Sequence, residues 1–306
     1  MIKKYNVICF INSAGINVIP ENIQDTMVSI KNNINTNFAF YICTDTDDRK
    51  LMIEKIAEKN NLNNYILEID VKKDSWANTF NNFFNKYKNH TDYILSSHDD
   101  LIVRTFDFFN ITMSEIEGKE DEIGWIGYTS DAYYRLGGNP VCQSAREMFC
   151  QDRFNWPKTY ELHNVTDKYD ESLLDMPSRS CIVSGIFSHF NLIKTTNLEK
   201  IGLCPNWGNY TLLIDEHWSL KTLINNMWTV WVPQVFYDHP IRGNMRVTSE
   251  LQNQHYVEMQ FYKLWGYNYL TTLTDEIIES VCRRFPNTNI GFFNNKKTYE
   301  YQYLKN

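Results

Sequence analysis

Four short apolar runs, separated by segments with helical spacing, occupy the first hundred residues of this chain. The runs are rich in β-branched and aromatic residues, which predicts strands over 5–11, 38–44, 65–71 and 93–96. The segments between them place apolar side chains on one side of a helix and span 21–32, 50–60 and 76–87. Strands that alternate with helices form sheets with right-handed crossover connections. The pattern therefore predicts an α/β fold with a mixed, mostly parallel central sheet flanked by helices.

The second half of the chain is less regular. We predict further strands over 123–128, 180–187 and 228–235, and helices over 192–202, 212–226, 256–264 and 275–284. Residues 135–168 show no clean period and are predicted to form either a long loop or a short helical insertion. No repeat or clear linker divides the chain. We therefore predict one domain over residues 1–250, with a helical C-terminal extension over residues 251–306 packed on it.

Charge and cysteine usage exclude several classes of protein. The formal net charge of −7 argues against a nucleic-acid binder, which needs a basic surface to hold phosphates. Seven cysteines without a Cys-x-x-Cys pair favour buried thiols in a reducing compartment. No apolar stretch is long enough to span a bilayer, and the N-terminus lacks the features of a signal peptide. We therefore expect a cytoplasmic location, with peripheral membrane association only through a partner.

Polar side chains cluster where three of the predicted strands end. Asn12-Ser13 follow the first strand, Asp45–Asp48 follow the second, and Ser97–Asp100 follow the fourth. In open α/β sheets, ligands bind at the carboxyl ends of the strands. The agreement among the three clusters predicts one ligand site along this edge. A plain turn with a helix cap remains an alternative for each cluster taken alone.

Adjacent carboxylates at Asp99 and Asp100 need a cation or hydrogen-bond donors, because like charges at this distance repel. A hard divalent metal that bridges a carboxylate to diphosphate oxygens satisfies that need. The pair therefore predicts a metal-diphosphate site, with an acidic turn as the alternative.

The order of these clusters resembles that of the inverting GT-A glycosyltransferases of family 2. The resemblance covers roughly residues 5–240 as an ordered set of short motifs, and it implies a GT-A, Rossmann-like fold. It also implies roles in nucleotide binding for Asn12 and Ser13 after the first strand, and for Asp45, which would bind the nucleobase. Asn81, in the helix before the strand at 93–96, would bind the nucleotide as well.

The same resemblance implies a metal centre. The Asp-x-Asp motif of the family falls on Ser97-His98-Asp99, with Ser97 in place of the first Asp. Asp99 is then the primary ligand of Mn²⁺ or Mg²⁺, and Asp100 is a second ligand or its outer partner. His239, after the strand at 228–235, completes the metal or diphosphate site. Arg242 follows on a predicted loop and either holds the leaving diphosphate or is a surface charge.

A late acidic motif supplies the candidate base. Asp215-Glu216-His217-Trp218 begins a predicted helix and resembles the family motif that deprotonates the acceptor hydroxyl. We assign the base to Asp215, and Glu216 is the alternative because the register is uncertain by one residue. An acidic cap favoured by the helix dipole is the structural alternative, and both can hold at once.

Taken together, the resemblance implies metal-dependent transfer of a sugar from a nucleotide diphosphate sugar, most often a UDP-sugar, with inversion. The implied acceptor is a glycan, a lipid-linked glycan or a protein, as in polysaccharide biosynthesis. Ser97 also leaves open a catalytically silent relative that binds a nucleotide sugar or glycan. A second alternative is another metal-dependent α/β enzyme that acts on a nucleotide, and the missing phosphate-binding loop counts against it.

Overall fold

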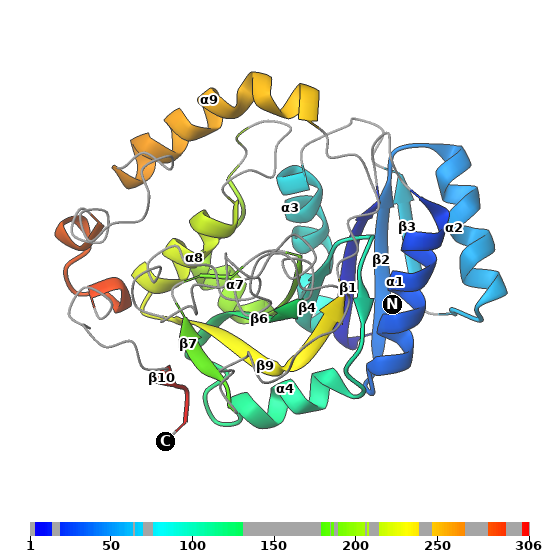
Figure 1. The fold of residues 1–306 in the computed structure, drawn as a ribbon, viewed down its shortest axis with the longest axis horizontal. Helices are drawn as coiled ribbons and strands as arrows, with labels where there is room; N and C mark the ends of the chain where they lie inside the picture. Colours follow the sequence, from blue (N-terminus) through cyan, green and yellow to red (C-terminus); the bar gives the residue numbers. More distant parts are fainter. Residues whose placement is uncertain are drawn as a thin grey trace, which may run out of the picture.

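A ten-stranded mixed sheet runs through the computed structural model of this chain, and helices cover both of its faces (Figure 1). The structure describes residues 4–13, 19–63, 65–69, 76–130, 179–183, 185–186, 189–205, 207, 214–238, 247–266, 281–291 and 302–305. The α/β class predicted from the sequence is confirmed.

The N-terminal half of the sheet is fully parallel, in the order β3-β2-β1-β4. Its strands are β1 (Tyr5–Ser13), β2 (Phe38–Thr44), β3 (Tyr65–Ile69) and β4 (Thr91–Ser97). The helices that join them are α1 (Pro20–Asn33), α2 (Asp47–Lys59) and α3 (Trp76–Tyr87), and the turn Lys88–His90 leads into β4. These elements confirm the predicted alternation of strand and helix.

Helix α2 begins three residues earlier than predicted. Thr46 is its N-cap, and the Thr46 side chain accepts a hydrogen bond from the Arg49 backbone N–H. Asp47 and Asp48 lie in the first turn, where the helix dipole favours negative charge. The helix-cap alternative therefore accounts for most of the Asp45–Asp48 cluster.

The second half of the sheet is joined to the first by an antiparallel strand. Strand β8 (Phe190–Lys194) lies between β4 and β6 (Ile123–Ser130) and is antiparallel to both. Strand β9 (Trp228–Asp238) is parallel to β6, and the outer strands are β7 (Cys181–Val183) and β10 (Gln302–Tyr303). Strand β5 (Ile102–Val103) pairs with β9 outside this order. Strands β1, β2, β3, β4, β6 and β9 all point the same way, so their carboxyl ends share one edge.

Some predicted elements need correction. The helix predicted from residue 192 is wrong over 192–194, where the chain forms β8, and helix α7 (Thr195–Ile201) begins only after it. A short apolar run is ambiguous, because a buried strand and a buried helix segment of that length have the same apolar pattern. The strand predicted over 180–187 is shortened to β7, and helix α4 (Phe108–Ile116) was not predicted. Helix α9 (Val247–Trp265) spans the predicted boundary at residue 250, and the predicted C-terminal extension also contributes β10 to the sheet.

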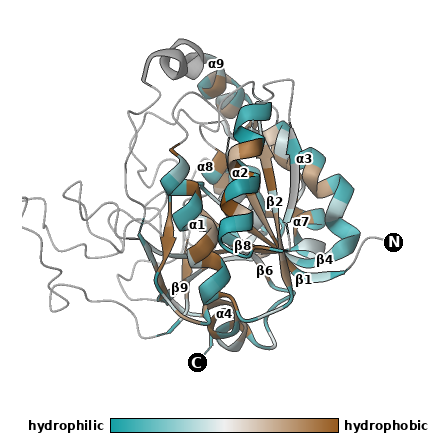
Figure 2. Cartoon of the chain, turned by 90° about the vertical axis from the view of Figure 1, so that its right-hand side faces the viewer, coloured by the Kyte–Doolittle hydropathy of each residue, from teal (hydrophilic) through white to brown (hydrophobic). Residues whose placement is uncertain are grey.

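The two faces of the sheet carry separate apolar cores. In β1, Val7, Cys9 and Ile11 face the core under α1, α2 and α4, whereas Ile8 and Phe10 face the core under α3, α7 and α8 (Ile214–Ile224). Burial on both faces explains why this strand is a continuous apolar run. The helices are correspondingly two-sided, with both hydrophilic and hydrophobic residues along α1, α2 and α3 (Figure 2). None of the described helices is both long and apolar enough to cross a membrane.

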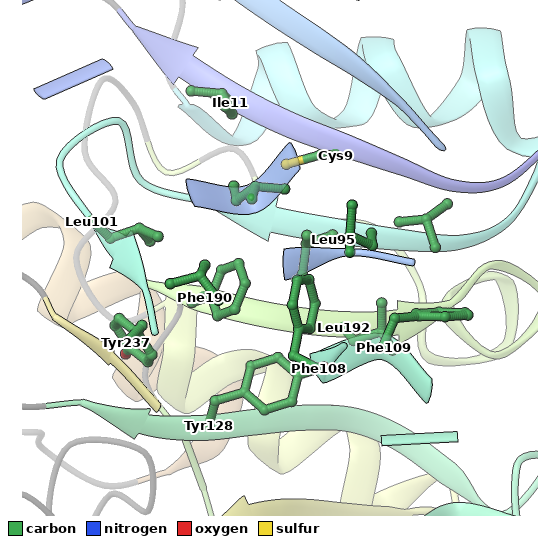
Figure 3. Packing of buried hydrophobic residues seen from close by; sticks show 14 of the residues in the cluster. Cys9, Ile11, Leu95, Leu101, Phe108, Phe109, Tyr128, Phe190, Leu192 and Tyr237 are labelled. Carbon is green, nitrogen blue, oxygen red and sulfur yellow. The ribbon is translucent and has the colours of Figure 1, made fainter. Parts of the chain in front are cut away.

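Aromatic rings fill the first core beneath α4. Phe108 of α4 packs against Phe190 of β8 with 5.4 Å between ring centroids, and Phe190 packs against Tyr128 of β6 at 5.2 Å (Figure 3). Phe190 also lies 5.4 Å from Tyr237 of β9. One buried ring of β8 therefore connects α4 with β6 and β9.

Close packing of α8 on the sheet depends on a glycine in β6. A Cβ atom on Gly124 would lie 2.5 Å from Thr222 Cγ2 and 2.7 Å from Ile201 Cδ1. We expect Gly124→Ala to lower the free energy of unfolding by about 1–3 kcal/mol, the usual cost of overpacking a core. Urea unfolding measures this, and Thr222→Ser, which removes the nearest methyl group, should recover part of the loss. Strictly additive losses in the double variant would contradict this packing.

Candidate active site at the carboxyl edge of the sheet

The ends of β1 and β4 meet as the sequence analysis predicted. Ile11 pairs with Ser97 in the β1–β4 register, so Ser13 lies level with Asp99. The Ser13 hydroxyl donates a hydrogen bond to Asp99 Oδ2 at 2.9 Å. Ser13 is fully buried and Asp99 is half-buried. The structure thus brings together two predicted site residues from strand ends that lie 86 positions apart.

Helix α1 holds the segment that follows Asp99 and Asp100. Thr26 Oγ1 donates to the Leu101 carbonyl at 2.8 Å and accepts from the Leu101 N–H at 3.0 Å. One turn later, Ser29 Oγ accepts from the Val103 N–H at 3.0 Å. These polar side chains replace the ladder partners that the segment lacks on this side. The backbone leaving the two aspartates is therefore fixed to α1.

The end of β9 lies on the other side of the same segment. Ile102 of β5 pairs with Asp238, and the Arg104 guanidinium forms an ion pair with the Asp238 carboxylate. Asp238 directly precedes His239 in the sequence, and its partner Ile102 lies three positions after Asp99. His239 and Arg242, the predicted metal and diphosphate ligands, lie outside the described residues.

An imidazole pair lies where β4 meets β8. The His98 backbone N–H donates to the His189 backbone carbonyl at 2.9 Å, and the two imidazole rings contact edge to face with 4.7 Å between centroids. His98 Nδ1 lies 3.9 Å from Asp100 Oδ1. The sequence analysis missed His189 because it missed β8, and only the β4–β8 pairing places this residue at the site. The buried Ser97 hydroxyl donates to the His98 carbonyl at 2.8 Å.

Two residues that are predicted to bind the nucleotide already contact other residues of the protein. The Asp45 carboxylate forms an ion pair with Arg49, one turn into α2. The Asn81 amide binds both backbone groups of Cys204, donating to its carbonyl at 2.8 Å and accepting from its N–H at 3.1 Å. Asn12 is half-buried near the end of β1. Nucleotide binding by these three residues stays a prediction.

The candidate base Asp215 lies half-buried in the first turn of α8. Burial raises the pKa of the Cys204 thiol well above its ordinary value, and the negative charge of Asp215 adds to this rise. The carboxylate therefore lies close to the Cys204 segment that Asn81 holds. The Glu216 side chain lies outside the described part of the structure, so of the two candidate bases only Asp215 is placed.

Aromatic packing ties this turn of α8 to α3. The Trp218 ring contacts Phe80 at 5.1 Å and Trp76 at 5.9 Å between centroids, and it contacts Trp125 of β6 at 5.2 Å. Helix α3 begins after β3 and α8 runs into β9, so both helices start at the carboxyl edge. Asp215 is thereby placed at the same edge of the sheet as Asp99.

His217, two residues after Asp215, is buried and neutral. Its Nδ1 accepts a hydrogen bond from the Trp265 indole N–H at 3.3 Å. Burial, together with the nearby charge of Lys221, lowers the pKa of His217 from 6.5 to about 3. The sequence analysis gave this residue no role.

Comparisons with known proteins bear on the fold. No protein-family model matches the sequence, and a comparison with curated proteins finds no match either. Among solved structures, GalNAc-T7 with UDP, GalNAc and Mn²⁺ is similar at a TM-score of 0.59 and 10% identity, over 96% of this chain. The chain spans only 56% of the length of GalNAc-T7.

A second solved structure has the same architecture. The mannosyltransferase PcManGT from Pyrobaculum calidifontis, in complex with GDP-Man and Mn²⁺, is similar at a TM-score of 0.56 and 10% identity. That match covers 95% of this chain and 72% of the mannosyltransferase. The GT-A fold predicted from the order of the sequence motifs is confirmed by these comparisons.

The buried state of His217 makes stability depend on pH. The folded protein keeps this imidazole neutral, whereas the unfolded chain binds a proton below about pH 6.5. Its contribution to stability is complete above that pH and falls by about 1.4 kcal/mol per pH unit toward pH 3. We expect urea unfolding of His217→Asn to show a flatter loss of stability than the wild type, by about 2 kcal/mol between pH 7 and pH 5. Parallel pH profiles would contradict a neutral, buried His217.

Proposed function

We propose that this chain is a metal-dependent glycosyltransferase that moves a sugar from a nucleotide diphosphate sugar to a hydroxyl acceptor. The observation that carries the proposal is the Ser13–Asp99 hydrogen bond, which joins the β1 and β4 ends in a GT-A fold. Asp215 lies at the same edge of the sheet. Both similar structures, solved with Mn²⁺ and a nucleotide or nucleotide sugar, support this choice of reaction class.

The donor would lie across the ends of β1, β2 and β4, with Asn12 and Ser13 under its nucleotide and Asp45 near its base. The two similar structures carry different nucleotides, UDP and GDP-Man, so the fold by itself does not select the base. We propose a UDP-sugar on the family resemblance. Arg242 would hold the diphosphate, a role that suits a guanidinium.

The carboxylates of Asp99 and the adjacent Asp100, with the Ser13 hydroxyl on Asp99, are oxygen ligands of the kind that a hard cation takes. Among the described residues, no group of three or more His, Cys, Asp and Glu side chains is arranged to hold a metal ion. Asp99 and Asp100 are therefore ligands that need completion, and we propose His239 and the donor diphosphate for it. When bound, Mn²⁺ or Mg²⁺ would neutralise charge on the departing diphosphate. The Ser13 hydroxyl keeps the Asp99 carboxylate oriented.

Asp215 would accept the proton of the acceptor hydroxyl as that hydroxyl attacks the anomeric carbon, with inversion. Its place in the first turn of α8 suits a carboxylate, because the N-terminus of a helix favours negative charge. Glu216 is the alternative base. A glycan, a lipid-linked glycan or a protein is proposed as the acceptor, and a cytoplasmic setting remains a prediction.

One observation favours a second candidate, a silent relative that binds a nucleotide sugar without transferring it. Ser97 stands where the family has its first Asp, and the buried Ser97 hydroxyl is used by the His98 carbonyl. Ser97 therefore supplies no carboxylate to the edge of the sheet. Activity measurements on the wild-type protein separate the two candidates.

We expect Asp215→Asn to lower the kcat for transfer at least 100-fold, because the amide cannot take up the proton. Donor binding should stay within about twofold, since the amide has nearly the shape of the carboxylate. The reaction is followed by release of nucleotide diphosphate from a panel of UDP- and GDP-sugars with Mn²⁺.

Asp121→Asn is the matched control for this variant. Asp121 is an exposed carboxylate paired with Lys194 before β6, at the opposite end of the sheet, and its substitution should leave kcat unchanged. Full activity of Asp215→Asn would remove Asp215 as the base. Donor binding without any turnover by the wild type would favour the silent relative.

We expect Asp99→Asn to weaken Mn²⁺-dependent nucleotide binding by at least tenfold, because the charge that holds the metal is lost. The Asn amide oxygen can still accept from Ser13, so the fold should persist. Thermal shifts with UDP and GDP, with and without Mn²⁺, measure the effect. Asp92→Asn makes the same change at the other end of β4, beside Lys4, and should not alter the shifts. Equal Mn²⁺-dependent shifts in all three proteins would place the metal elsewhere.

A further inference from the structure

The first turn of α8 is held from a side that the proposed reaction does not use. The His217 imidazole contacts the rings of Trp207 and Trp265, with 5.2 Å and 5.6 Å between centroids. The Trp265 indole N–H donates to His217 Nδ1 at 3.3 Å, and both residues are buried. Trp265 is the last residue of α9, so the contact joins the C-terminal segment to the helix that carries Asp215.

We propose that Trp265 is a positioning residue, which orients the Asp215 carboxylate through its hydrogen bond to His217. The inference rests on the proposed function, because it assumes that Asp215 is the base. It gives the C-terminal segment a role in the reaction rather than in folding alone.

Helix geometry explains how one hydrogen bond can orient a neighbouring carboxylate. Residues two apart in a helix point about 200° away from each other around the axis. Holding His217 against α9 therefore turns Asp215 away from α9 and toward Cys204, the residue whose thiol pKa it raises. Trp218, one residue after His217, packs against the aromatic rings of α3. Contacts with α9 and with α3 thus set the rotation of this turn.

The imidazole suits this task because its protonation state does not change near neutral pH. An indole N–H can only donate, so Nδ1 accepts and the neutral ring carries its proton on Nε2. Because burial lowers the pKa of His217 to about 3, the ring takes up no proton near neutral pH and Nδ1 remains an acceptor. The hydrogen bond can therefore act as a fixed support rather than as a switch.

The end of α9 is itself anchored. Arg284 Nη1 donates to the Leu264 carbonyl at 2.9 Å, and Phe285 contacts the Trp265 ring with 6.0 Å between centroids. Phe261, one turn before Trp265, is fully buried and packs on Trp207 at 6.0 Å. Tyr256 and Tyr262 of the same helix are exposed. Buried aromatic side chains of α9 therefore serve the α8 contact, and its exposed tyrosines offer control positions.

The decisive variant is Trp265→Phe, which keeps an aromatic ring but removes the N–H donor. We expect kcat for transfer to fall about 10- to 100-fold, as small displacements of reacting groups cost up to that much. The KM for the donor and the Mn²⁺-dependent shift with UDP should stay within about twofold. Tyr262→Phe, the matched control on the exposed side of α9, should leave both parameters unchanged. A fall in donor affinity together with kcat, or an unchanged kcat, would overturn the inference.

Substitution of His217 tests the same hydrogen bond from its other end. Asn can present an oxygen close to the position of Nδ1, whereas Leu cannot accept a hydrogen bond. We expect His217→Asn to retain most of the kcat that His217→Leu loses. Equal losses in both variants, at equal thermal stability, would show that packing and not the hydrogen bond matters.

Hydrogen–deuterium exchange gives a readout that does not depend on turnover. We expect the amides of the first turns of α8 to exchange at least tenfold faster in Trp265→Phe than in the wild type, while β1 and β4 stay protected. Unchanged exchange in α8 would overturn the inference even if the protein proved inactive. Faster exchange in Trp265→Phe, together with a wild-type protein that turns over no donor, would instead remove the proposed function and leave the contact as a structural one.

Discussion

The backbone ladder that seats β8 between β4 and β6 is the interaction on which the rest of this structure depends. Strands β4 and β6 point the same way but do not pair, and β8 satisfies the hydrogen-bonding groups of both as an antiparallel strand. Without it, the parallel N-terminal half and the β6–β9 half would be separate sheets. With it, the carboxyl ends of both halves lie along one edge, and His189 lies against His98. The buried rings of Phe190, Phe108 and Tyr128 stabilise this junction.

Polar side chains then order the segments that leave that edge. Thr26 and Ser29 of α1 bind the backbone at Leu101 and Val103, and Asn81 of α3 binds both groups of Cys204. Buried backbone groups outside the ladder need partners, and these side chains supply them. The Asp99 and Asp215 neighbourhoods are therefore held by helices on different faces of the sheet.

That arrangement divides the candidate chemistry between two faces. Ser13 continues the side of β1 that packs under α1, so the Ser13–Asp99 pair belongs to the first face. Asp215 lies by Cys204 and Trp218, which belong to the core under α3 and α8. The Ser13–Asp99 pair and the proposed base thus approach the edge from opposite sides of one sheet. A substrate held across the edge would meet both carboxylates.

Local patterns in the sequence determined most of the N-terminal half. Parallel strands buried on both faces are continuous apolar runs, so β1, β2 and β4 could be placed to within two residues, and α3 carries its period in its own aromatic side chains. The order of polar clusters also indicated the edge at which Ser13 and Asp99 meet. Tertiary structure alone decided what these side chains touch. The β8 pairing, the Asn81–Cys204 contact across 123 positions and the Trp265–His217 hydrogen bond across 48 positions have no local signature, because each depends on packing between segments that are remote in the sequence.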